Sequence, residues 1–567
     1  MIVHSSQELS PRTVDNEDRL PRVPLPTLEE SCERFLEWCG PLLTPEELAV
    51  TEIAVASFLR PGSPARTLHA ALERYDASDG VHSWLDTFWP YRYLGRRDRI
   101  ALNANFFFLF EDSEQGQVDR AAALVAGALD YKLLLDEQRV APAVQRGRPL
   151  SMEQNKYLFS ATRIPGPARD SVRTPYSDDW PGPSRERHIV VFVRGNMFRL
   201  DVIDPDGRPH TTDELVEGLR AVLAAGATPA APGTSIGHLT TKARAEWAAS
   251  RQALLDCHPG NTNLLDTVET ALFCLCLEDT TPQDALAACD QLLHGDSGNR
   301  WFDKALSLIV FPDGTAGLNG EHCKLDGTTV VSFVNAMLGS SAQRHPRRSA
   351  AESPVVPACA RLDFVLATDL RSDVQAAAAA FAAYAADTAS TTLRIEGFTS
   401  ERAKQLGMSP DAFAQLAFQL VHQRAKGHLG ATYESIATRH YRHGRTEAMR
   451  VVTPEVVRFV AAMDDPGADD QTRRAAFRAA AQKHVHRAKQ CQAGQAPEQH
   501  LWELQLIQQR RGAELGVTEP LALYESPGWL TMRDDYLSTS AVSSAHIQFF
   551  GFGSTSRKCI GIGYALL

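Results

Sequence analysis

The chain has 567 residues, of which 58 are Lys or Arg and 69 are Asp or Glu, so its formal net charge is −11. This length exceeds the roughly 100–200 residues of a single domain and predicts two domain-sized cores. The acidic balance gives no electrostatic reason to expect a nucleic-acid partner, and no stretch approaches the ~18 consecutive apolar residues that a membrane span needs.

Two features bear on the compartment of the protein. Residues 1–20 mix acidic and basic side chains and contain no apolar core, unlike a secretory signal or a transit peptide. We therefore expect a cytoplasmic protein with a disordered leader at 1–20. The ten cysteines are scattered and include no paired C-x-x-C spacing, which argues against a disulfide framework and against a structural metal site.

The first part of the chain mixes helices and strands. After Pro21, apolar residues at helical spacing predict two helices joined by a turn. The turn Arg194-Gly195-Asn196 separates two apolar runs and suits a hairpin. The other patterns of this part predict strands at 188–193, 197–203 and 306–311 and helices at 211–225, 240–256 and 264–277.

The second part shows the same mixture after 340–357, a polar, proline-containing stretch that is the best candidate for an inter-domain linker. The alanine-rich run 372–388 predicts a helix because Ala has the highest helix propensity. Further helices are expected at 409–426, 430–443, 453–464 and 470–489, and strands at 361–366, 545–551 and 559–566. Strands interspersed with helices throughout the chain predict an α/β fold.

A histidine stands out in the segment 312–327, PDGTAGLNGEHCKLDG, which leaves an expected strand, passes through three glycines and then presents Glu321-His322. A loop histidine is accessible, and an ordinary pKa near ~6.5 suits proton transfer at pH 7. Taken alone, one loop histidine among 18 is more often an ordinary surface or hydrogen-bonded residue. The surrounding motifs decide its interpretation.

Several motifs, in order along the chain, resemble the carnitine/choline acyltransferase family. The segment RWFDKALSLIVFPDGTAGLNGEHCKLDG (300–327) is similar to the catalytic-histidine region of that family. Further similar segments are PLSMEQNKYLFSATRIPGPARD (149–170), LTTKARAEWAASR (239–251), the SPDAF to GRTE stretch (409–450), and the C-terminal YLSTSAV and FFGFG. The resemblance runs over about residues 20 to 567.

The resemblance implies an α/β architecture of two chloramphenicol-acetyltransferase-like domains, each a mixed β-sheet with flanking helices, with an active-site tunnel at their interface. We expect an N-terminal half, 21–355, that carries the catalytic histidine. We expect a C-terminal half, 356–567, that carries the CoA-binding and Ser-Thr-Ser motifs. The helices within 21–80 could pack on the C-terminal half instead.

The resemblance implies His322 as the general base. An alcohol has a pKa far above 7, so its attack on a thioester needs a base in contact with the hydroxyl as the new bond forms. No acyl-enzyme is required. Ser540, the second serine of the Ser-Thr-Ser motif, is implied as the donor to the tetrahedral oxyanion, a contribution on the order of 3 kcal/mol. Asp326 is expected to orient the histidine loop.

Coenzyme A is implied as a cosubstrate, with no permanently bound cofactor. Its phosphates need a local basic cluster on a chain that is acidic as a whole. Lys404 matches a family lysine that meets the 3′-phosphate, and Asp411 resembles the family's adenine-contacting acid. Relatives carry a second lysine where this chain has Ser400, with Arg402 nearby as a substitute.

The acceptor side is implied by Tyr433 and Thr446, which match positions that hold the carboxylate of carnitine in carnitine-specific relatives. Those relatives add an arginine from a helix that reads D-R-H-L-L-G-L. Aligning the trailing glycine of that helix to Gly516 puts Gly512 at the place of the arginine, with Arg511 adjacent.

Three further residues are expected to contact substrate. Ser538 begins the Ser-Thr-Ser motif, and Phe550 corresponds to an aromatic packed near the trimethylammonium, which a ring face attracts. Gln548 replaces a residue that is apolar or glycine in relatives and borders the acyl pocket. We therefore expect an acyl group with polar functionality or a modified tunnel.

The leading hypothesis is acyl transfer from acyl-CoA to the hydroxyl of carnitine or a carnitine-like acceptor. One alternative keeps this chemistry but uses a different biosynthetic alcohol, with the acyl group supplied by CoA or by an acyl carrier protein, which would then be a partner. A second alternative is a catalytically silent CoA-binding protein.

Overall fold

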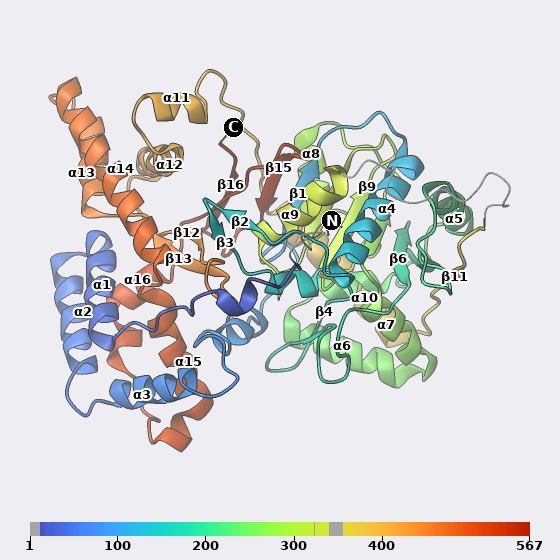
Figure 1. Ribbon diagram of the computed structural model, residues 1–567, viewed down its shortest axis with the longest axis horizontal. Coiled ribbons are helices and arrows are strands. Elements are labelled where there is room, and N and C mark those ends of the chain that lie inside the picture. The colour runs from blue at the N-terminus through green and yellow to red at the C-terminus, as the bar shows by residue number, and fades with distance from the viewer. Residues whose placement is uncertain (1–11, 323, 340–354, 567) are drawn as a thin grey trace, which may run out of the picture. The chain divides into compact units, whose positions relative to one another are not determined.

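The computed structural model describes residues 12–322, 324–339 and 355–566, which divide into two compact units (Figure 1). Unit 1 comprises residues 12–20, 93–391 and 544–552, and unit 2 comprises residues 21–92, 392–543 and 553–566. These units interleave along the chain, and helices of 21–80 belong to unit 2. Most of the expected linker at 340–357 lies outside the described residues.

The elements of unit 1 are η1 (Glu17–Arg19), β1 (Phe106–Phe110), α4 (Gln117–Asp136), β2 (Val144–Gln145), β3 (Arg148–Pro149), η4 (Glu153–Tyr157), β4 (Thr162–Ile164), β5 (Ser171–Arg173), β6 (His188–Val193), β7 (Asn196–Asp201), α5 (Thr212–Ala225), η5 (Ile236–Thr241), α6 (Arg244–Cys257), α7 (Gly260–Thr270), β8 (Cys274–Leu277), α8 (Ala285–Leu293), η6 (Ser297–Asn299), β9 (Leu306–Val310), β10 (Ala316–Gly320), α9 (Gly327–Gly339), β11 (Cys359–Arg361), α10 (Thr368–Ala386) and β15 (Ile547–Phe552). The short π-helix η3 (Pro90–Leu94) crosses from the residues of one unit to those of the other.

Eight strands of unit 1 form one mixed sheet in the order β11-β7-β6-β8-β9-β10-β1-β15. Strands β6, β8 and β9 run parallel to one another, and the outer pairs are antiparallel. Strand β15, from near the C-terminus, pairs with β1 and completes one edge (Figure 1). The strands expected at 188–193, 197–203, 306–311 and 545–551 correspond to β6, β7, β9 and β15.

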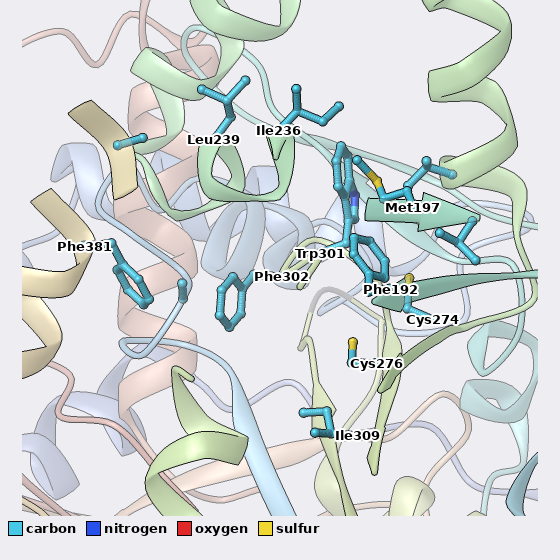
Figure 2. Close-up of a cluster of buried hydrophobic side chains, with 14 of the residues drawn as sticks. Phe192, Met197, Ile236, Leu239, Cys274, Cys276, Trp301, Phe302, Ile309 and Phe381 are labelled. Atoms are coloured by element: carbon cyan, nitrogen blue, oxygen red, sulfur yellow. The ribbon is translucent and has the colours of Figure 1, made fainter. Parts of the chain in front are cut away.

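One face of this sheet packs against α6, α7, α8 and α10 in a large apolar core. Figure 2 shows Phe192, Cys274 and Ile309, which come from three adjacent strands of this core, and Phe192 lies beside Trp301. Helices α4 and α5 pack on the sheet as well, and α9 packs on α4. Every residue of β6, β8 and β9 is buried, as is typical of strands that are covered on both faces.

The expected helix over 264–277 is wrong in its second part. Helix α7 ends at Thr270, and β8 begins at Cys274. All four residues of β8 are buried and apolar. A strand that is buried on both faces shows no alternation, so periodicity does not distinguish it from a buried helix. The strand expected at 361–366 is also wrong beyond its first residue, because β11 spans Cys359–Arg361 and residues 362–366 form no strand.

The glycine-rich stretch before His322 is a strand rather than a loop. Strand β10 pairs antiparallel with β9 and with β1. A Cβ on Gly317 would lie 2.4 Å from the backbone oxygen of Phe108, and one on Gly320 would lie 2.5 Å from the ring of Phe106. These glycines therefore allow neighbouring groups to approach the strand closely.

The expectation of a disordered leader does not hold for residues 12–20. The Glu17 carboxylate accepts hydrogen bonds from Ser151 Oγ at 2.6 Å and from the Met152 amide at 3.0 Å. Thr13 Oγ1 donates to the carbonyl of Val140 at 2.8 Å. These bonds tie the segment to unit 1, and residues 1–11 lie outside the described part of the chain.

The elements of unit 2 are α1 (Leu28–Cys39), η2 (Gly40–Leu42), α2 (Pro45–Phe58), α3 (Pro64–Asp76), α11 (Ser400–Gln405), α12 (Pro410–Lys426), β12 (Thr432–Ala437), β13 (Thr446–Arg450), α13 (Pro454–Asp464), α14 (Asp470–Gln492), α15 (Glu498–Leu515), η7 (Ala522–Glu525), α16 (Pro527–Met532), β14 (Leu537–Ala541) and β16 (Ile560–Tyr564). Helices α1 and α2 are the pair expected after Pro21, and each begins with a capping box, at Thr27 and Thr44.

Four strands of unit 2 form a sheet in the order β13-β12-β14-β16. Strands β12, β14 and β16 are parallel, and β13 is antiparallel at one edge. Side chains of β12 and β13 pack with α1, α2, α3, α15 and α16 in one apolar core, and α12, α13 and α14 form a second, smaller one.

The expected helix over 430–443 is wrong, because Thr432–Ala437 form β12. Burial alternates residue by residue along this strand, which is the period-2 pattern of a half-buried sheet. Pairing with β13 on one side and β14 on the other decides the conformation. Strands and helices in both units confirm the expected α/β class. Among the described residues, no helix is both long and apolar enough to cross a membrane.

Candidate active site

His322 follows β10 in unit 1, and its hydrogen bond defines the tautomer of the ring. Nδ1 lies 2.9 Å from the backbone oxygen of Leu325. A carbonyl oxygen only accepts, so Nδ1 carries the proton and Nε2 carries the lone pair. Nδ1 is also 3.9 Å from Asp326 Oδ1, and a quarter of the side chain is exposed. The ring is therefore set up as a base at Nε2.

Two aromatic rings of unit 1 hold the imidazole plane. The Tyr93 ring stacks on His322 with centroids 5.6 Å apart and planes 12° apart. The Phe106 ring of β1 packs at a centroid distance of 4.7 Å. The faces of these two rings hold the imidazole in place without exchanging a proton with it.

A buried arginine supports both sides of the histidine. Arg163 Nη1 donates to the carboxylate of Glu321 at 3.0 Å, and Nη2 donates to the backbone oxygen of Tyr93 at 2.8 Å. Its Nε donates to Asp170 at 2.6 Å. Arg163 and Glu321 are almost wholly buried. The ion pair between Glu321 and Arg163 therefore holds the chain beside His322.

Gln154 of η4 anchors the loop that follows His322. Its Nε2 donates to Asp326 Oδ2 at 2.7 Å. Its Oε1 accepts from the Asp326 amide at 2.8 Å and from Thr329 Oγ1 at 2.9 Å. These bonds fit the orienting role expected for Asp326, because the same loop carries the Leu325 carbonyl that binds His322.

In unit 2, four of the expected substrate residues share one face of the four-stranded sheet. Residues opposite one another in neighbouring strands lie on the same face, as do residues two apart along one strand. Tyr433 is opposite Ser538, and Thr446 is opposite Ala437, four residues after Tyr433. Ser540 lies two residues after Ser538. We call the face that carries Tyr433, Thr446, Ser538 and Ser540 the serine face.

Small residues border the two serines on this face. Ser538 is opposite Gly561 and Ser540 is opposite Gly563 on β16. A glycine has no side chain to cover its neighbour, so one flank of each hydroxyl is left without a side chain.

The opposite face of the same sheet is held by buried amides. Thr539 Oγ1 donates to the backbone oxygen of Tyr433 and accepts from Gln415 Nε2, both at 2.8 Å. Gln415 also donates to the Tyr564 hydroxyl at 3.0 Å. Helix α12 therefore fixes β14 from behind the serine face.

Asp411, the expected CoA residue, lies in a polar cluster on this opposite face. Its carboxylate accepts from Tyr564 at 2.6 Å and from His484 Nε2 at 3.1 Å. Burial raises the pKa of Asp411, but these bonds outweigh it and hold the pKa below its usual value. Burial and the nearby Asp411 raise the pKa of Glu434 well above its usual value.

Ligand atoms of Asp411, Glu434 and His484 lie within 4.8 Å of one another, a spacing that could also hold a metal ion. A hydrogen bond already joins Asp411 and His484, and the raised pKa of Glu434 favours its neutral form, which repels Asp411 less. Glu434 Oε2 and His484 Nδ1 are buried and have no hydrogen-bond partner among the described residues, so the cluster is only partly satisfied.

The two basic CoA candidates lie on α11 and face solvent. Lys404 is more than half exposed and pairs with Glu401 at 2.5 Å. Arg402 is exposed as well. An exposed ion pair contributes only about 0–1 kcal/mol, so Lys404 can exchange Glu401 for a phosphate at little cost.

Arg511 and Thr446 are associated with opposite ends of α15. Arg511 is in the last turns of the helix, exposed and paired with Glu514 at 2.6 Å. Gln499 is in the first turn, and its Nε2 donates to the backbone oxygen of Thr446 at 2.8 Å. At about 1.5 Å per residue, the two positions are roughly 18 Å apart along the helix.

Gln499 is a candidate site residue that the sequence alignment above missed. The signal was the segment EQHLWEL (498–504), whose histidine and two leucines match the D-R-H-L-L-G-L pattern. This alignment puts Gln499 at the position of the arginine, and its contact with Thr446 supports that placement.

Gln548 and Phe550 belong to unit 1 on β15, beside β1 (Figure 1). The register shifts between Leu109 and Phe110, so that Gln548 is the extra residue of a bulge. Its Nε2 donates to Phe110 O at 3.2 Å and to Asp112 Oδ1 at 2.8 Å. The amide is only partly buried, and its donors are satisfied within unit 1.

Each unit thus gathers part of the expected site. Unit 1 holds His322, Phe550 and Gln548, and unit 2 holds the serine face and the CoA candidates. A tunnel between the two stays a prediction.

Comparison with known proteins gives one consistent family. The family model "Choline/Carnitine o-acyltransferase" matches residues 23–567. A mitochondrial carnitine O-palmitoyltransferase 2 of Mus musculus is 31% identical, over 98% of this chain and 87% of the relative. A carnitine O-acetyltransferase of Columba livia is 33% identical, over 97% and 87%. A peroxisomal carnitine O-octanoyltransferase of Homo sapiens is 32% identical, over 95% and 88%. The chain therefore belongs to the choline/carnitine O-acyltransferase family and is an enzyme of the O-acyltransferase class.

Proposed function

We propose that this O-acyltransferase moves an acyl group from acyl-CoA to the hydroxyl of an acceptor alcohol, with Nε2 of His322 as the general base. The observation that carries the proposal is the bond from Nδ1 to the Leu325 carbonyl. It leaves the second nitrogen as a hydrogen-bond acceptor on a ring that is partly exposed.

The proposed reaction proceeds in a ternary complex without an acyl-enzyme. Nε2 of His322 takes the hydroxyl proton as the alcohol oxygen attacks the thioester carbon. The Ser540 hydroxyl donates to the oxygen of the tetrahedral intermediate, which supplies on the order of 3 kcal/mol. The intermediate then expels the CoA thiolate, which receives the proton from His322, so the imidazole returns to its neutral form.

The donor is proposed to be CoA, bound through the 3′-phosphate by Lys404 with help from Arg402, and through adenine by Asp411. The exposure of both basic side chains supports this assignment, since a phosphate can reach them. An acyl carrier protein as donor remains a prediction without supporting contacts among the described residues.

The acceptor is the less determined partner. The relatives are named for carnitine, and Tyr433 and Thr446 share the serine face as a carnitine site would need. The contact between Gln499 and Thr446 favours the alternative, which keeps the chemistry but uses another alcohol. Ser538 would contact the acceptor from the same face, and Phe550 would pack near a quaternary ammonium.

The acyl group is not determined by Gln548. Because Phe110 and Asp112 already accept from the amide of Gln548, that amide does not require a polar acyl chain. The expectation of a polar acyl group stays a prediction, as does the cytoplasmic location, since relatives carry mitochondrial or peroxisomal in their names.

Thiol release tests the proposed function. The full-length protein is given acetyl-, octanoyl- or palmitoyl-CoA with a panel of alcohols, and the ester product is identified by mass spectrometry. We expect thiol release that depends on the alcohol, with intersecting double-reciprocal plots and no burst of acyl-enzyme. CoA binding by calorimetry, without release for any alcohol, would instead support the silent binding protein.

A further inference from the structure

Within the described part of the chain, Gln499 has hydrogen-bond partners for only one end of its amide, beside the serine face. The residue is buried in the first turn of α15, and its Nε2 donates to the carbonyl oxygen of Thr446 at 2.8 Å. That contact fixes the orientation of the amide, because the reverse orientation would put two oxygens against each other. The side-chain Oε1 is buried and has no hydrogen-bond partner among the described residues.

A buried amide oxygen without a partner is uncommon and costly. The partner that this oxygen lacks must be a hydrogen-bond donor, because an amide oxygen accepts and never donates. A ligand group that meets Oε1 must therefore bring an O–H or N–H. A carboxylate at neutral pH presents only acceptor oxygens and would be repelled by Oε1.

The cations around Gln499 already have carboxylates or an aromatic ring as partners. Glu498 binds Arg450 with both oxygens, at 2.6 and 2.8 Å, and Asp535 binds the same guanidinium. Arg533 lies 3.5 Å from Glu498 and 3.3 Å from the Trp502 ring centroid. Arg92 lies over the same Trp502 ring at 4.7 Å and also interacts electrostatically with Glu498, so three arginines meet two carboxylates at this end of α15.

The cations in the last turns of α15 are paired as well. Arg510 binds Glu503 at 2.5 Å, and Arg511 binds Glu514 at 2.6 Å. A carboxylate brought to Gln499 would therefore have to compete with an existing carboxylate for any of these cations, at a cost in desolvation.

We infer that Gln499 selects an acceptor alcohol with a neutral hydrogen-bond donor, a hydroxyl or an amide, where carnitine presents its carboxylate. The inference rests on the proposed function for the placement of the acceptor beside Tyr433 and Thr446. The acceptor class is thus a polyhydroxy or amide-bearing alcohol, and Gln499 is its specificity-determining residue.

A matched pair of acceptors tests this assignment with the full-length protein and acetyl-CoA. L-Carnitinamide differs from L-carnitine only in carrying a carboxamide in place of the carboxylate. We expect kcat/KM for carnitinamide to exceed that for carnitine by about tenfold or more. In Gln499→Arg, the guanidinium supplies a cation, and we expect the preference to reverse in favour of carnitine. A wild-type preference for carnitine would overturn the inference.

A control substitution on the same helix separates the site from a general effect of charge. Gln508 is a half-buried glutamine of α15 whose Nε2 also donates to a backbone oxygen, that of Glu519, at 2.7 Å. Gln508→Arg should leave the ratio of the two kcat/KM values within about twofold of the wild type. If Gln499→Arg fails to fold, Gln499→Met removes Oε1 without adding charge and should abolish the preference for carnitinamide.

Binding provides a readout that does not depend on catalysis. Calorimetric titration of each acceptor into the CoA-saturated protein should give a lower Kd for carnitinamide. If this binding preference holds without any thiol release, the proposed function fails and the inference stands. If thiol release is normal and the two Kd values are equal, the inference fails and the proposed function stands.

Discussion

Gln415→Leu tests whether α12 positions the serine face of β14 from behind. Gln415 is fully buried, and it reaches both Thr539 Oγ1 and the Tyr564 hydroxyl. Leucine has a similar size but donates no hydrogen bond. The substitution therefore removes two bonds to neighbouring strands and leaves the packing of α12 nearly intact.

The magnitude follows from the two bonds that are lost. Each neutral hydrogen bond contributes about 0.5–1.5 kcal/mol net, so the loss in the free energy of unfolding is at most about 1–3 kcal/mol. Removal of Gln415 Oε1, which has no partner among the described residues, offsets part of this loss. Neither hydroxyl becomes an unsatisfied donor, because Thr539 still donates to Tyr433 and Tyr564 still donates to Asp411. If the displacement of Ser540 costs one to two kcal/mol of transition-state stabilisation, kcat falls about 5- to 30-fold.

A double-mutant cycle with Thr539→Val measures the coupling. The assay is kcat for thiol release, together with the midpoint of urea unfolding for each variant. Since the two residues share a bond, we expect a coupling energy of about 0.5–3 kcal/mol, with the double variant less impaired than the two single effects combined.

Gln419→Leu is the matched control on the same face of α12. Gln419 is equally buried but is bonded to Thr432 of β12 rather than to β14. It should destabilise the protein to a similar extent and lower kcat less. Additive effects of Gln415→Leu and Thr539→Val, or an equal loss of kcat in Gln419→Leu, would refute the positioning role.

Three further substitutions follow from the geometry. Ser540→Ala should lower kcat about 10- to 1000-fold with little change in the Kd of CoA, as measured by calorimetry. Burial raises the pKa of Glu434, so its contribution to stability is full below about pH 4.5 and is lost as pH rises through the folded-state pKa. Glu434→Gln should therefore raise the thermal midpoint relative to wild type more at pH 9 than at pH 5. Gly320→Ala should push the Phe106 ring, lower kcat through His322, and destabilise the protein by about 1–3 kcal/mol in urea unfolding.

Local patterns predicted much of the fold. The hairpin at Arg194-Gly195 forms as expected, with both residues at positive φ. The alanine-rich run is indeed a helix, α10. Strands β8 and β12 were misassigned because their conformation is decided by strand pairing rather than by local propensity.

The motifs predicted which residues belong to the site, but they did not predict how these residues are arranged in space. Register alone puts Tyr433, Thr446 and Ser540 on one face, and no spacing in the sequence encodes that register. The role of Gln154 was also hidden, because it meets Asp326 only after folding. Gln499 was missed because the alignment was anchored on a glycine and not on the histidine and leucines of the pattern.

The most direct test of the account is His322→Ala, measured as thiol release beside the Kd of CoA. If Nε2 is the base, kcat falls by about 10²–10⁴-fold while the Kd of CoA stays within about twofold of the wild type. A variant that keeps most of its alcohol-dependent turnover would contradict the account.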